Sequence, residues 1–182
     1  MECTRQGSAE KTSARIRHGR PADIDALLEL LRTLFAIEED FVFDRAKARQ
    51  GLELLLDAAT ATVLVAEDDG RVVGMCTGQV VISTAEGGPA VLVEDVVVQP
   101  GWRGRGIGRA LLDALAAWSG RQGARRMQLL ADRGNRDGLA FYHRTGWQST
   151  QLICLRKKNF PGTGHSFPPG QGQPGADNTE GS

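Results

Sequence analysis

The chain has 182 residues, of which 41% are hydrophobic, enough to bury one core but hardly two. Its 22 basic and 22 acidic side chains balance, so the chain as a whole has no electrostatic reason to bind nucleic acid or an anionic membrane. Its three cysteines, Cys3, Cys76 and Cys154, are odd in number and far apart, which argues against a disulfide framework and against a metal site with paired spacings.

Both ends of the chain differ in composition from its middle. Residues 1–13 are polar and lack the apolar core of a signal peptide, and no apolar run of the chain approaches the ~20 residues that span a bilayer. Residues 159–182 hold four of the seven prolines, a composition typical of a disordered tail. We therefore expect a cytoplasmic protein with a flexible arm at residues 1–13, a folded domain at residues 14–158 and a disordered tail at residues 159–182.

The first half of the expected domain alternates between helical and strand periodicity. Pro21 and Asp23 suit the first turn of a helix whose apolar side chains recur at helical spacing up to Phe35. Further on, Asp68-Asp69-Gly70 is a hairpin signal between two apolar segments. The elements expected here are strands at residues 14–18, 61–67 and 71–83 and helices at residues 21–35 and 44–58.

The second half of the domain continues this alternation. Residues 90–98 are apolar and rich in β-branched side chains, and Pro100 and Gly101 end that strand. Apolar side chains then recur at helical spacing from Ile107 to Trp118, and glycines close that helix. The remaining elements expected are a strand at residues 125–131, a short helix at residues 135–144 and a last strand or strand pair at residues 147–157.

The turn between the strand at residues 90–98 and the next helix interleaves glycine with arginine. The glycines are Gly104, Gly106 and Gly108, and the arginines are Arg103, Arg105 and Arg109. Backbone N–H groups at a helix N-terminus lack intrahelical partners and carry the positive end of the helix dipole. A glycine loop there can wrap a phosphate closely, so the segment predicts an anion-binding site.

Two familiar phosphate loops fit this segment poorly. A nucleotide-binding P-loop needs Gly-Lys-Ser/Thr, which the chain lacks. A dinucleotide-binding fold needs G-x-G-x-x-G early in a βαβ unit, with an acidic residue about 20 positions further on. Here the glycines read G-x-G-x-G past the middle of the chain, although Asp132 could imitate the acidic residue. The dinucleotide interpretation is therefore weakened and stays open.

A third kind of loop fits better. Arg103 to Gly108 matches the pattern R/Q-x-x-G-x-G/A, and the match extends through VEDVVVQPGWRGRGIG and NRDGLAFYHRTGW. On these motifs the chain resembles the GNAT superfamily of N-acetyltransferases, with the family's order of elements over residues 14–158. The resemblance implies an α/β fold with a mixed, largely antiparallel central sheet, a splayed fourth and fifth strand pair and flanking helices. It also implies acetyl-CoA as the cofactor and a homodimer as in many relatives.

The same resemblance implies where the cofactor binds. Main-chain groups of Val96 and Val98 align the pantetheine arm, and the N–H of Val96 polarises the thioester carbonyl. The glycine loop and its arginines hold the pyrophosphate. The expected cofactor-binding residues are Val96, Val97, Val98, Arg103, Gly104, Arg105, Gly106, Ile107, Gly108, Arg109, Asn135 and Tyr142.

Two residues are expected to move protons. Tyr142, the only tyrosine, lies seven residues after Asn135, the arrangement in which the family places a general acid. A phenol with a pKa of ~10 is protonated at neutral pH and can donate to the leaving thiolate. Glu94 and Asp95 are acidic residues in an otherwise apolar strand. Glu94 shares strand parity with Val96 and is the expected base, although a β-bulge would disturb that parity.

The acceptor amine is expected to bind beside Asp95 and near Glu38, Glu39 and Phe41, between the two N-terminal helices. The sequence therefore predicts an N-acetyltransferase that transfers the acetyl group of acetyl-CoA to a primary amine of a small molecule or peptide, by direct attack in a ternary complex. No metal, nucleic acid or membrane is expected to take part. A non-catalytic acyl-CoA-binding module and a dinucleotide-binding protein are the alternatives.

Overall fold

The computed structural model describes residues 14–37 and 42–157. The chain divides into two compact units, residues 1–150 and 151–182, and every helix and strand of the described residues lies in the first unit. None of the described helices is both long and apolar enough to cross a membrane.

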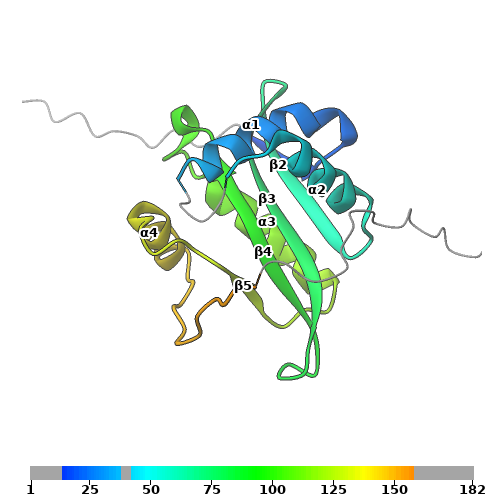
Figure 1. Cartoon of the computed structure of the whole chain (residues 1–182), viewed down its shortest axis with the longest axis vertical. Coiled ribbons are helices and arrows are strands. Elements are labelled where there is room, and N and C mark those ends of the chain that lie inside the picture. The colour runs from blue at the N-terminus through cyan, green and yellow to red at the C-terminus, as the bar shows by residue number, and fades with distance from the viewer. Residues whose placement is uncertain (1–13, 38–41, 158–182) are drawn as a thin grey trace, which may run out of the picture. The chain divides into compact units, whose positions relative to one another are not determined.

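The elements follow the predicted order up to the last helix (Figure 1). They are β1 (Arg15–His18), η1 (Pro21–Asp23), α1 (Ile24–Phe35), α2 (Arg45–Asp57), β2 (Ala61–Asp68), β3 (Arg71–Ser83), β4 (Gly88–Val98), η2 (Pro100–Trp102), α3 (Ile107–Arg121), β5 (Met127–Leu129) and α4 (Arg136–Arg144). The strands form one sheet in the order β1-β2-β3-β4-β5, antiparallel except for the parallel β4–β5 pair. This mixed, largely antiparallel α/β architecture confirms the predicted fold class, although β5 is shorter than the strand expected at residues 125–131.

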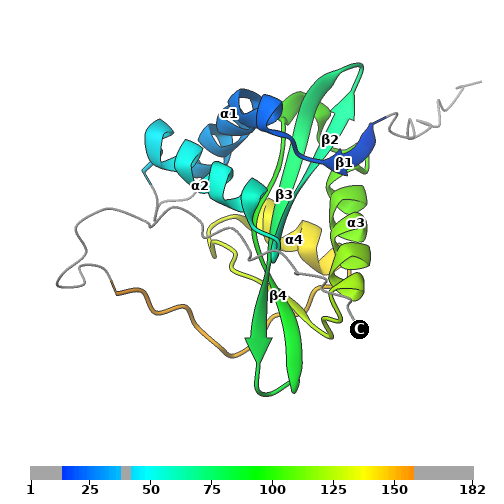
Figure 2. The ribbon, with the colours of Figure 1, turned by 90° about the vertical axis from the view of Figure 1, so that its right-hand side faces the viewer.

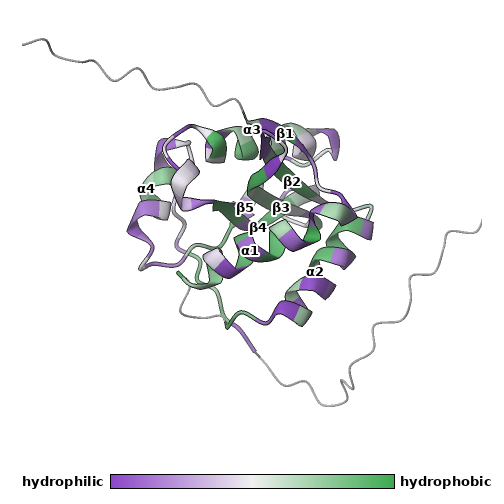
Figure 3. Ribbon diagram, turned by 90° about the horizontal axis from the view of Figure 1, so that it is seen from above, coloured by the Kyte–Doolittle hydropathy of each residue, from purple (hydrophilic) through white to green (hydrophobic). Residues whose placement is uncertain are grey.

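Helices cover both faces of the sheet. α1 and α2 pack on one face and α3 on the other, as Figure 2 shows, and Figure 3 shows the apolar strands between these layers. Successive side chains of a strand point to opposite faces, so β2, β3 and β4 supply both cores. The core under α1 and α2 includes Leu27, Leu28, Leu31, Leu52, Val63, Val65, Met75 and Val97. The core under α3 includes Leu64, Ala66, Val73, Cys76, Val91, Val93, Val96, Ile107, Leu111 and Leu115.

Two short sequence features set local geometry, a helix cap at Asp44 that was not predicted and the predicted hairpin turn at Asp69-Gly70. The Oδ1 of Asp44 accepts hydrogen bonds from the backbone N–H groups of Ala46 and Lys47 at 3.0 and 3.1 Å, which satisfies two of the donors that a helix start leaves unpaired. Asp69 and Gly70 have φ angles of 47° and 73°, as a type I′ hairpin turn requires. The second helix and the β2–β3 hairpin therefore form as predicted.

β4 has two different halves. Residues 91–93 pair with residues 127–129 of β5, and the parallel pairing ends there. β4 itself continues to Val98 against β3, so β5 does not pair with the second half of β4. This is the predicted splay of the fourth and fifth strands. It leaves one backbone edge of β4 open beside the cavity described below.

The prediction of a last strand at residues 147–157 is wrong. These residues carry no strand, and the large apolar side chains of Leu152 and Leu155 are each 86% exposed. Cys154, in the same segment, is exposed as well. Apolar and β-branched composition favours a strand only where a neighbouring edge pairs with it and a face is buried.

An ion network ties β1 to the start of α1. The guanidinium of Arg17 donates to both carboxylate oxygens of Asp23 at 2.7 and 2.9 Å and to Glu67 at 2.8 Å. The side chains of Arg17 and Asp23 are each only 11% exposed. Because the hydrogen bonds from Arg17 stabilise the carboxylate, the pKa of Asp23 lies below its usual value. Asp23 also accepts from the backbone N–H of Arg20 at 2.8 Å, so it fixes the turn that leads into α1.

Candidate active site

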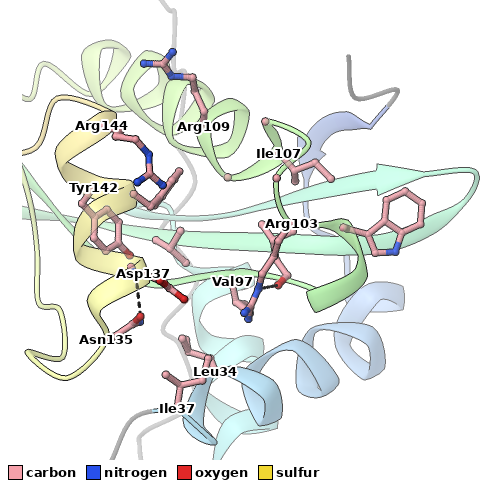
Figure 4. Close-up of a pocket in the computed structure, with 18 residues that line it drawn as sticks. Leu34, Ile37, Val97, Arg103, Ile107, Arg109, Asn135, Asp137, Tyr142 and Arg144 are labelled. Carbon is pink, nitrogen blue, oxygen red and sulfur yellow. Dashed lines mark hydrogen bonds between the residues drawn. The ribbon is translucent and has the colours of Figure 1, made fainter. Parts of the chain in front are cut away.

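A cavity of about 400 Å³ lies at the open edge of β4. Its walls come from the second half of β4, the loop before α3, the first turn of α3, α4 and the end of α1 (Figure 4). The lining residues are Leu34, Ile37, Val96, Val97, Val98, Trp102, Arg103, Gly104, Gly106, Ile107, Gly108, Arg109, Asn135, Asp137, Gly138, Phe141, Tyr142 and Arg144. The volume suits a small-molecule or cofactor site. All the expected cofactor-binding residues except Arg105 line this cavity.

The glycine loop forms an open helix start. Gly104 and Gly106 have φ angles of 79° and 83°, a left-handed conformation in which any other L-residue is strained. Gly106 is the N-cap of α3, and no side chain of the described residues caps it. The first backbone N–H groups of α3 therefore face the cavity with the positive end of the helix dipole, as an anion site requires.

Gly108 has a different role from the other two glycines. A Cβ atom at this position would lie 3.0 Å from the ring carbon Cζ of Phe141 on α4. The absence of a side chain at Gly108 therefore allows α3 and α4 to approach each other. This close packing brings the residues of α4, Tyr142 among them, to the cavity beside the anion site.

The arginines of the loop point in different directions. Arg103 lines the cavity, and its Nε donates to the carbonyl oxygen of Val98 at 3.1 Å. Arg105 does not line it, because its guanidinium lies 4.8 Å from the ring centroid of Trp102 and its Nη2 donates to the carbonyl of Gly101 at 3.3 Å. Of the three loop arginines, Arg103 and Arg109 therefore line the cavity and Arg105 does not.

Charge in the cavity is predominantly positive. Arg103, Arg109 and Arg144 line it, together with one acidic residue, Asp137. Among the described residues no carboxylate forms an ion pair with any of these three arginines. Unpaired guanidinium groups beside a helix N-terminus provide the charge and the donors that bind phosphate groups.

The two ends of the cavity differ in polarity. In Figure 4, Arg109 and Arg144 lie at one end, and Leu34 and Ile37 of the α1 region lie at the other, with Val97 of β4 and the side chain of Arg103 nearer to Leu34 and Ile37. An elongated ligand with a polyanionic end and a less polar end matches this arrangement. The open backbone edge of β4 runs along the cavity, where an extended amide-bearing chain can pair with it.

Tyr142 and Asn135 both reach the cavity from α4 (Figure 4). The ring of Tyr142 packs between Phe141 and Trp147, with centroid distances of 5.3 and 6.0 Å. These two contacts restrict the movement of the ring beside the cavity that Tyr142 lines. Asn135 is also the N-cap of α4, because its Oδ1 accepts from the N–H of Gly138 at 2.9 Å. The sequence did not predict this second role of Asn135.

The expected base lies beside a β-bulge. Cys76 of β3 pairs with Val96, but Gly78, two residues on, pairs with Val93. Two residues of β4, Glu94 and Asp95, therefore lie opposite one residue of β3. Val93 and Val96 both pack in the core under α3 although they are three residues apart. The bulge thus removes the parity argument that favoured Glu94 over Asp95.

Both carboxylates are hydrogen-bonded, and neither lines the cavity. Glu94 is exposed and accepts from the Nε2 of Gln79 at 2.8 Å. Asp95 is half-buried and accepts from the hydroxyl of Thr77 at 3.1 Å. Both groups lie within two residues of Val96, which lines the cavity.

Cys76 has no nucleophilic role at neutral pH. The residue is fully buried under α3, and its Sγ donates to the carbonyl of Leu111 at 3.7 Å. Burial, together with the negative charge of Asp95, raises the pKa of the Cys76 thiol to about 12. The thiol therefore stays protonated and packs as a small apolar group.

Several lining residues were not predicted from the sequence. Asp137, Phe141 and Arg144 lie four and three residues apart, on one face of α4. None of them is three or four residues from Tyr142, so helical spacing from the predicted Tyr142 does not identify them. Leu34 and Ile37 reach the cavity only through the packing of α1 against the sheet, which no local pattern reports. Of the expected acceptor-site residues, Glu38, Glu39 and Phe41 lie outside the described residues.

Comparison with known proteins agrees with this geometry. A family model described as the acetyltransferase (GNAT) family matches residues 24–147. The aminoglycoside N(6')-acetyltransferase type 1 of Stenotrophomonas maltophilia is 32% identical over 115 residues, which cover 62% of this chain and 71% of that protein. The putative ribosomal protein bS18-alanine N-acetyltransferase of Bacillus subtilis (strain 168) is 26% identical over 141 residues, which cover 76% of this chain and 83% of that protein.

Solved structures agree as well. The aminoglycoside N-acetyltransferase AAC(6')-Iy in complex with CoA superposes with a TM-score of 0.70 at 19% identity, covering 86% of this chain and 99% of that chain. At this level of identity the likeness shows a shared fold.

Proposed function

Because this chain belongs to the acetyltransferase (GNAT) family, we propose that it transfers the acetyl group of acetyl-CoA to a primary amine of a small molecule or peptide. The relatives support N-acetyl transfer as the activity. One is named for an aminoglycoside and another for the alanine of a ribosomal protein, so both classes of amine are candidate acceptors. The acetyl donor and the acceptor of this chain belong to the proposal.

The cavity at the open edge of β4 carries the proposal. Its basic end, with Arg109, Arg144 and the uncapped start of α3, suits the phosphates of coenzyme A. Its open strand edge suits the amides of pantetheine, and the acetyl group then lies near Val96 and Val97. A single elongated cofactor therefore accounts for both the charge and the shape of the cavity.

We assign the protonation of the leaving group to Tyr142. The amine nitrogen attacks the thioester carbonyl carbon, the new C–N bond forms and the C–S bond breaks, with the electron pair going to sulfur. The Tyr142 hydroxyl gives its proton to that thiolate, and a proton from solvent restores the phenol in exchange for the one that the amine releases through its base. Tyr142 lines the cavity and its ring is held by two aromatic neighbours, which supports this role.

The base that takes the amine proton is Glu94 or Asp95, acting through water. Glu94 is the exposed carboxylate, whereas Asp95 is fixed by Thr77. We keep Glu94 as the proposed base and Asp95 as a residue of the acceptor site.

The alternatives explain fewer of the observations. A non-catalytic acyl-CoA-binding module needs the loop but no hydroxyl donor, whereas Tyr142 lies in the same cavity. A dinucleotide-binding fold needs a parallel sheet with the loop early in a βαβ unit, whereas this sheet is antiparallel except for β4–β5. The proposed folded domain spans residues 14–158, and a cytoplasmic homodimer is the proposed form.

The test is a free-thiol assay with acetyl-CoA and a panel of amines that includes an aminoglycoside, a polyamine and a peptide with N-terminal alanine. We expect thiol release that depends on one class of amine. Replacing Tyr142 by Phe should lower kcat by roughly 10² while leaving the Kd of acetyl-CoA nearly unchanged, because only a proton donor is removed.

The matched control is His143→Gln, the next residue on the same helix. His143 is exposed and does not line the cavity, so this variant should keep wild-type turnover. A Tyr142→Phe enzyme with wild-type kcat, in a reaction limited by chemistry, would remove the general-acid role. Absence of turnover with every amine, despite tight acetyl-CoA binding, would favour the non-catalytic module.

A further inference from the structure

The bulge in β4 has a side-chain partner on β3. At a β-bulge two residues face one, and a backbone N–H group of the bulged strand loses its regular ladder partner. Here the hydroxyl of Thr77 takes that place, because its Oγ1 accepts a hydrogen bond from the backbone N–H of Asp95 at 3.0 Å. The same hydroxyl donates to the carboxylate oxygen Oδ2 of Asp95 at 3.1 Å.

Thr77 is placed to hold the backbone of Asp95 in one conformation. It is 0% exposed, so no solvent molecule replaces its hydroxyl when the hydroxyl is removed. Its two hydrogen bonds join the main chain and the side chain of one residue, Asp95, and so restrict both the position and the rotation of that peptide. The nearby β3 residue Gly78 packs directly under Leu115 of α3, which fixes this part of β3 in turn.

The position of this contact divides β4 into its two halves. The pairing with β5 ends at Val93, and the residues that line the cavity begin at Val96. Asp95 lies between them. The geometry of the bulge therefore decides which way the backbone groups of Val96 to Val98 point as the strand enters the cavity.

We propose that Thr77 is a positioning residue, which acts through Asp95 to orient the open backbone edge of Val96 to Val98 toward the pantetheine arm of the cofactor. This inference rests on the proposed function. It assigns to a buried residue of the neighbouring strand, remote from every motif of the sequence, part of the affinity for the extended half of coenzyme A.

A positioning role differs from a purely structural role in which half of the cofactor it affects. The proposed function assigns the nucleotide half to the glycine loop and its arginines. The hydrogen bond from Arg103 meets β4 at the carbonyl of Val98, three residues beyond Asp95, and that from Arg105 goes to Gly101. A misaligned β4 edge therefore weakens binding of intact CoA but not binding of 3′-phospho-ADP, which has the phosphates without pantetheine. General destabilisation of the fold would weaken the binding of both CoA and 3′-phospho-ADP, or of neither.

The experiment compares Thr77→Val with Thr77→Ser by calorimetric titration of CoA and 3′-phospho-ADP. Valine keeps the shape and removes both hydrogen bonds, whereas serine keeps the hydroxyl. Thr77→Val should raise the Kd of CoA about tenfold, the effect of leaving a buried polar group unpaired, while the Kd of 3′-phospho-ADP stays within about twofold. Thr77→Ser should restore CoA binding to within about threefold of the wild type.

A matched control is available on β2. Thr62 is 4% exposed, and its Oγ1 lies 3.1 Å from the ring nitrogen Nδ1 of His18, away from β4. Thr62→Val therefore removes a buried hydroxyl without touching the bulge, and both affinities should stay at wild-type values. Thermal melts of all variants report the stability cost separately.

Two results would overturn the proposal. One is a Thr77→Val protein that binds CoA as tightly as the wild type. The other is a variant that loses affinity for 3′-phospho-ADP and CoA in equal proportion. If Thr77→Val does not fold, Thr77→Ala, which adds no methyl groups beside the bulge, is measured against the same criteria. A wild-type protein that binds neither ligand would instead overturn the proposed function itself.

Discussion

Arg17 and the three arginines of the cavity are the same residue type in opposite environments. Arg17 is nearly buried and donates to two carboxylates, Asp23 and Glu67. Arg103, Arg109 and Arg144 form no ion pair with any described carboxylate, although Asp137 lines the same cavity. The charge of Arg17 is therefore compensated within the fold, whereas the charges of the three cavity arginines are available to a ligand.

This difference separates stability from binding. Removing one partner of a buried, fully paired charge leaves the other charges uncompensated, which lowers the free energy of unfolding. Removing an unpaired surface charge costs little stability but weakens the attraction for an anion. Replacement of Arg17 should therefore lower the free energy of unfolding, whereas replacement of a cavity arginine should weaken the binding of an anionic ligand.

The largest effect is expected for Arg17→Met. The change leaves Asp23 and Glu67 without their common donor in a nearly buried site, so the free energy of unfolding should fall by about 3 kcal/mol. The Kd of CoA should not change, because Arg17 does not line the cavity. Urea unfolding and calorimetry on the same protein check both statements, and a variant of unchanged stability would contradict the structural role.

The next effect is a dependence of stability on pH that comes from Asp23. The pKa of this carboxyl is lower in the folded than in the unfolded protein because of its hydrogen bonds with Arg17. The group therefore stabilises the fold fully above its ordinary pKa of ~3.9, and the contribution is lost as the pH falls below that value toward the folded pKa. Urea unfolding between pH 6 and pH 3 should show a steeper loss in the wild type than in Asp23→Asn. Parallel curves would contradict this assignment.

A smaller effect, on binding alone, is expected for Arg103→Gln. Loss of one charge at the anion site should raise the Kd of CoA about tenfold at low ionic strength and less at high salt, because screening weakens the interaction in both proteins. The melting temperature should stay close to that of the wild type. A fall in stability without a change in the Kd of CoA would mean that Arg103, like Arg17, has a structural role and does not bind the ligand.

The smallest effect is expected for Arg105→Gln. Arg105 stacks on Trp102 and does not line the cavity, so its replacement should change the Kd of CoA less than the replacement of Arg103 does. Titrations of both variants at one salt concentration decide the order. Equal losses would mean that Arg105 leaves Trp102 when the cofactor binds.

The part of the cavity lining that comes from the glycine loop and α4 could be predicted from the sequence because its signals are local. The glycines and arginines of residues 103–109 are contiguous with the strand and the helix that position them, and Asn135 and Tyr142 belong to one short helix. Sequence signals likewise placed every strand and α-helix from β1 to α4, but not the short helix η2. Local chemistry and tertiary structure agree over this part of the chain.

The rest of the site depends on contacts between distant segments. Thr77 is an unremarkable residue in an apolar strand until the register of β3 against β4 places it opposite the bulge. Leu34 and Ile37 are part of an ordinary amphipathic helix until packing brings them to the cavity. The opposite error occurred at residues 147–157, where a strand-like composition has no strand in the structure. Register and pairing are tertiary properties, and composition alone does not report them.

The most direct test of the account is a calorimetric titration of the purified protein with acetyl-CoA, CoA and NAD, repeated on Gly106→Val. The account predicts that acetyl-CoA and CoA bind with one site per chain and that NAD does not. A valine at Gly106 should weaken CoA binding strongly, because the residue is strained at a φ of 83° and its side chain projects into the open space where the proposed function puts the phosphates. Tight binding of NAD, or equal affinity of a folded Gly106→Val protein for acetyl-CoA, would contradict the assignment of this cavity to coenzyme A.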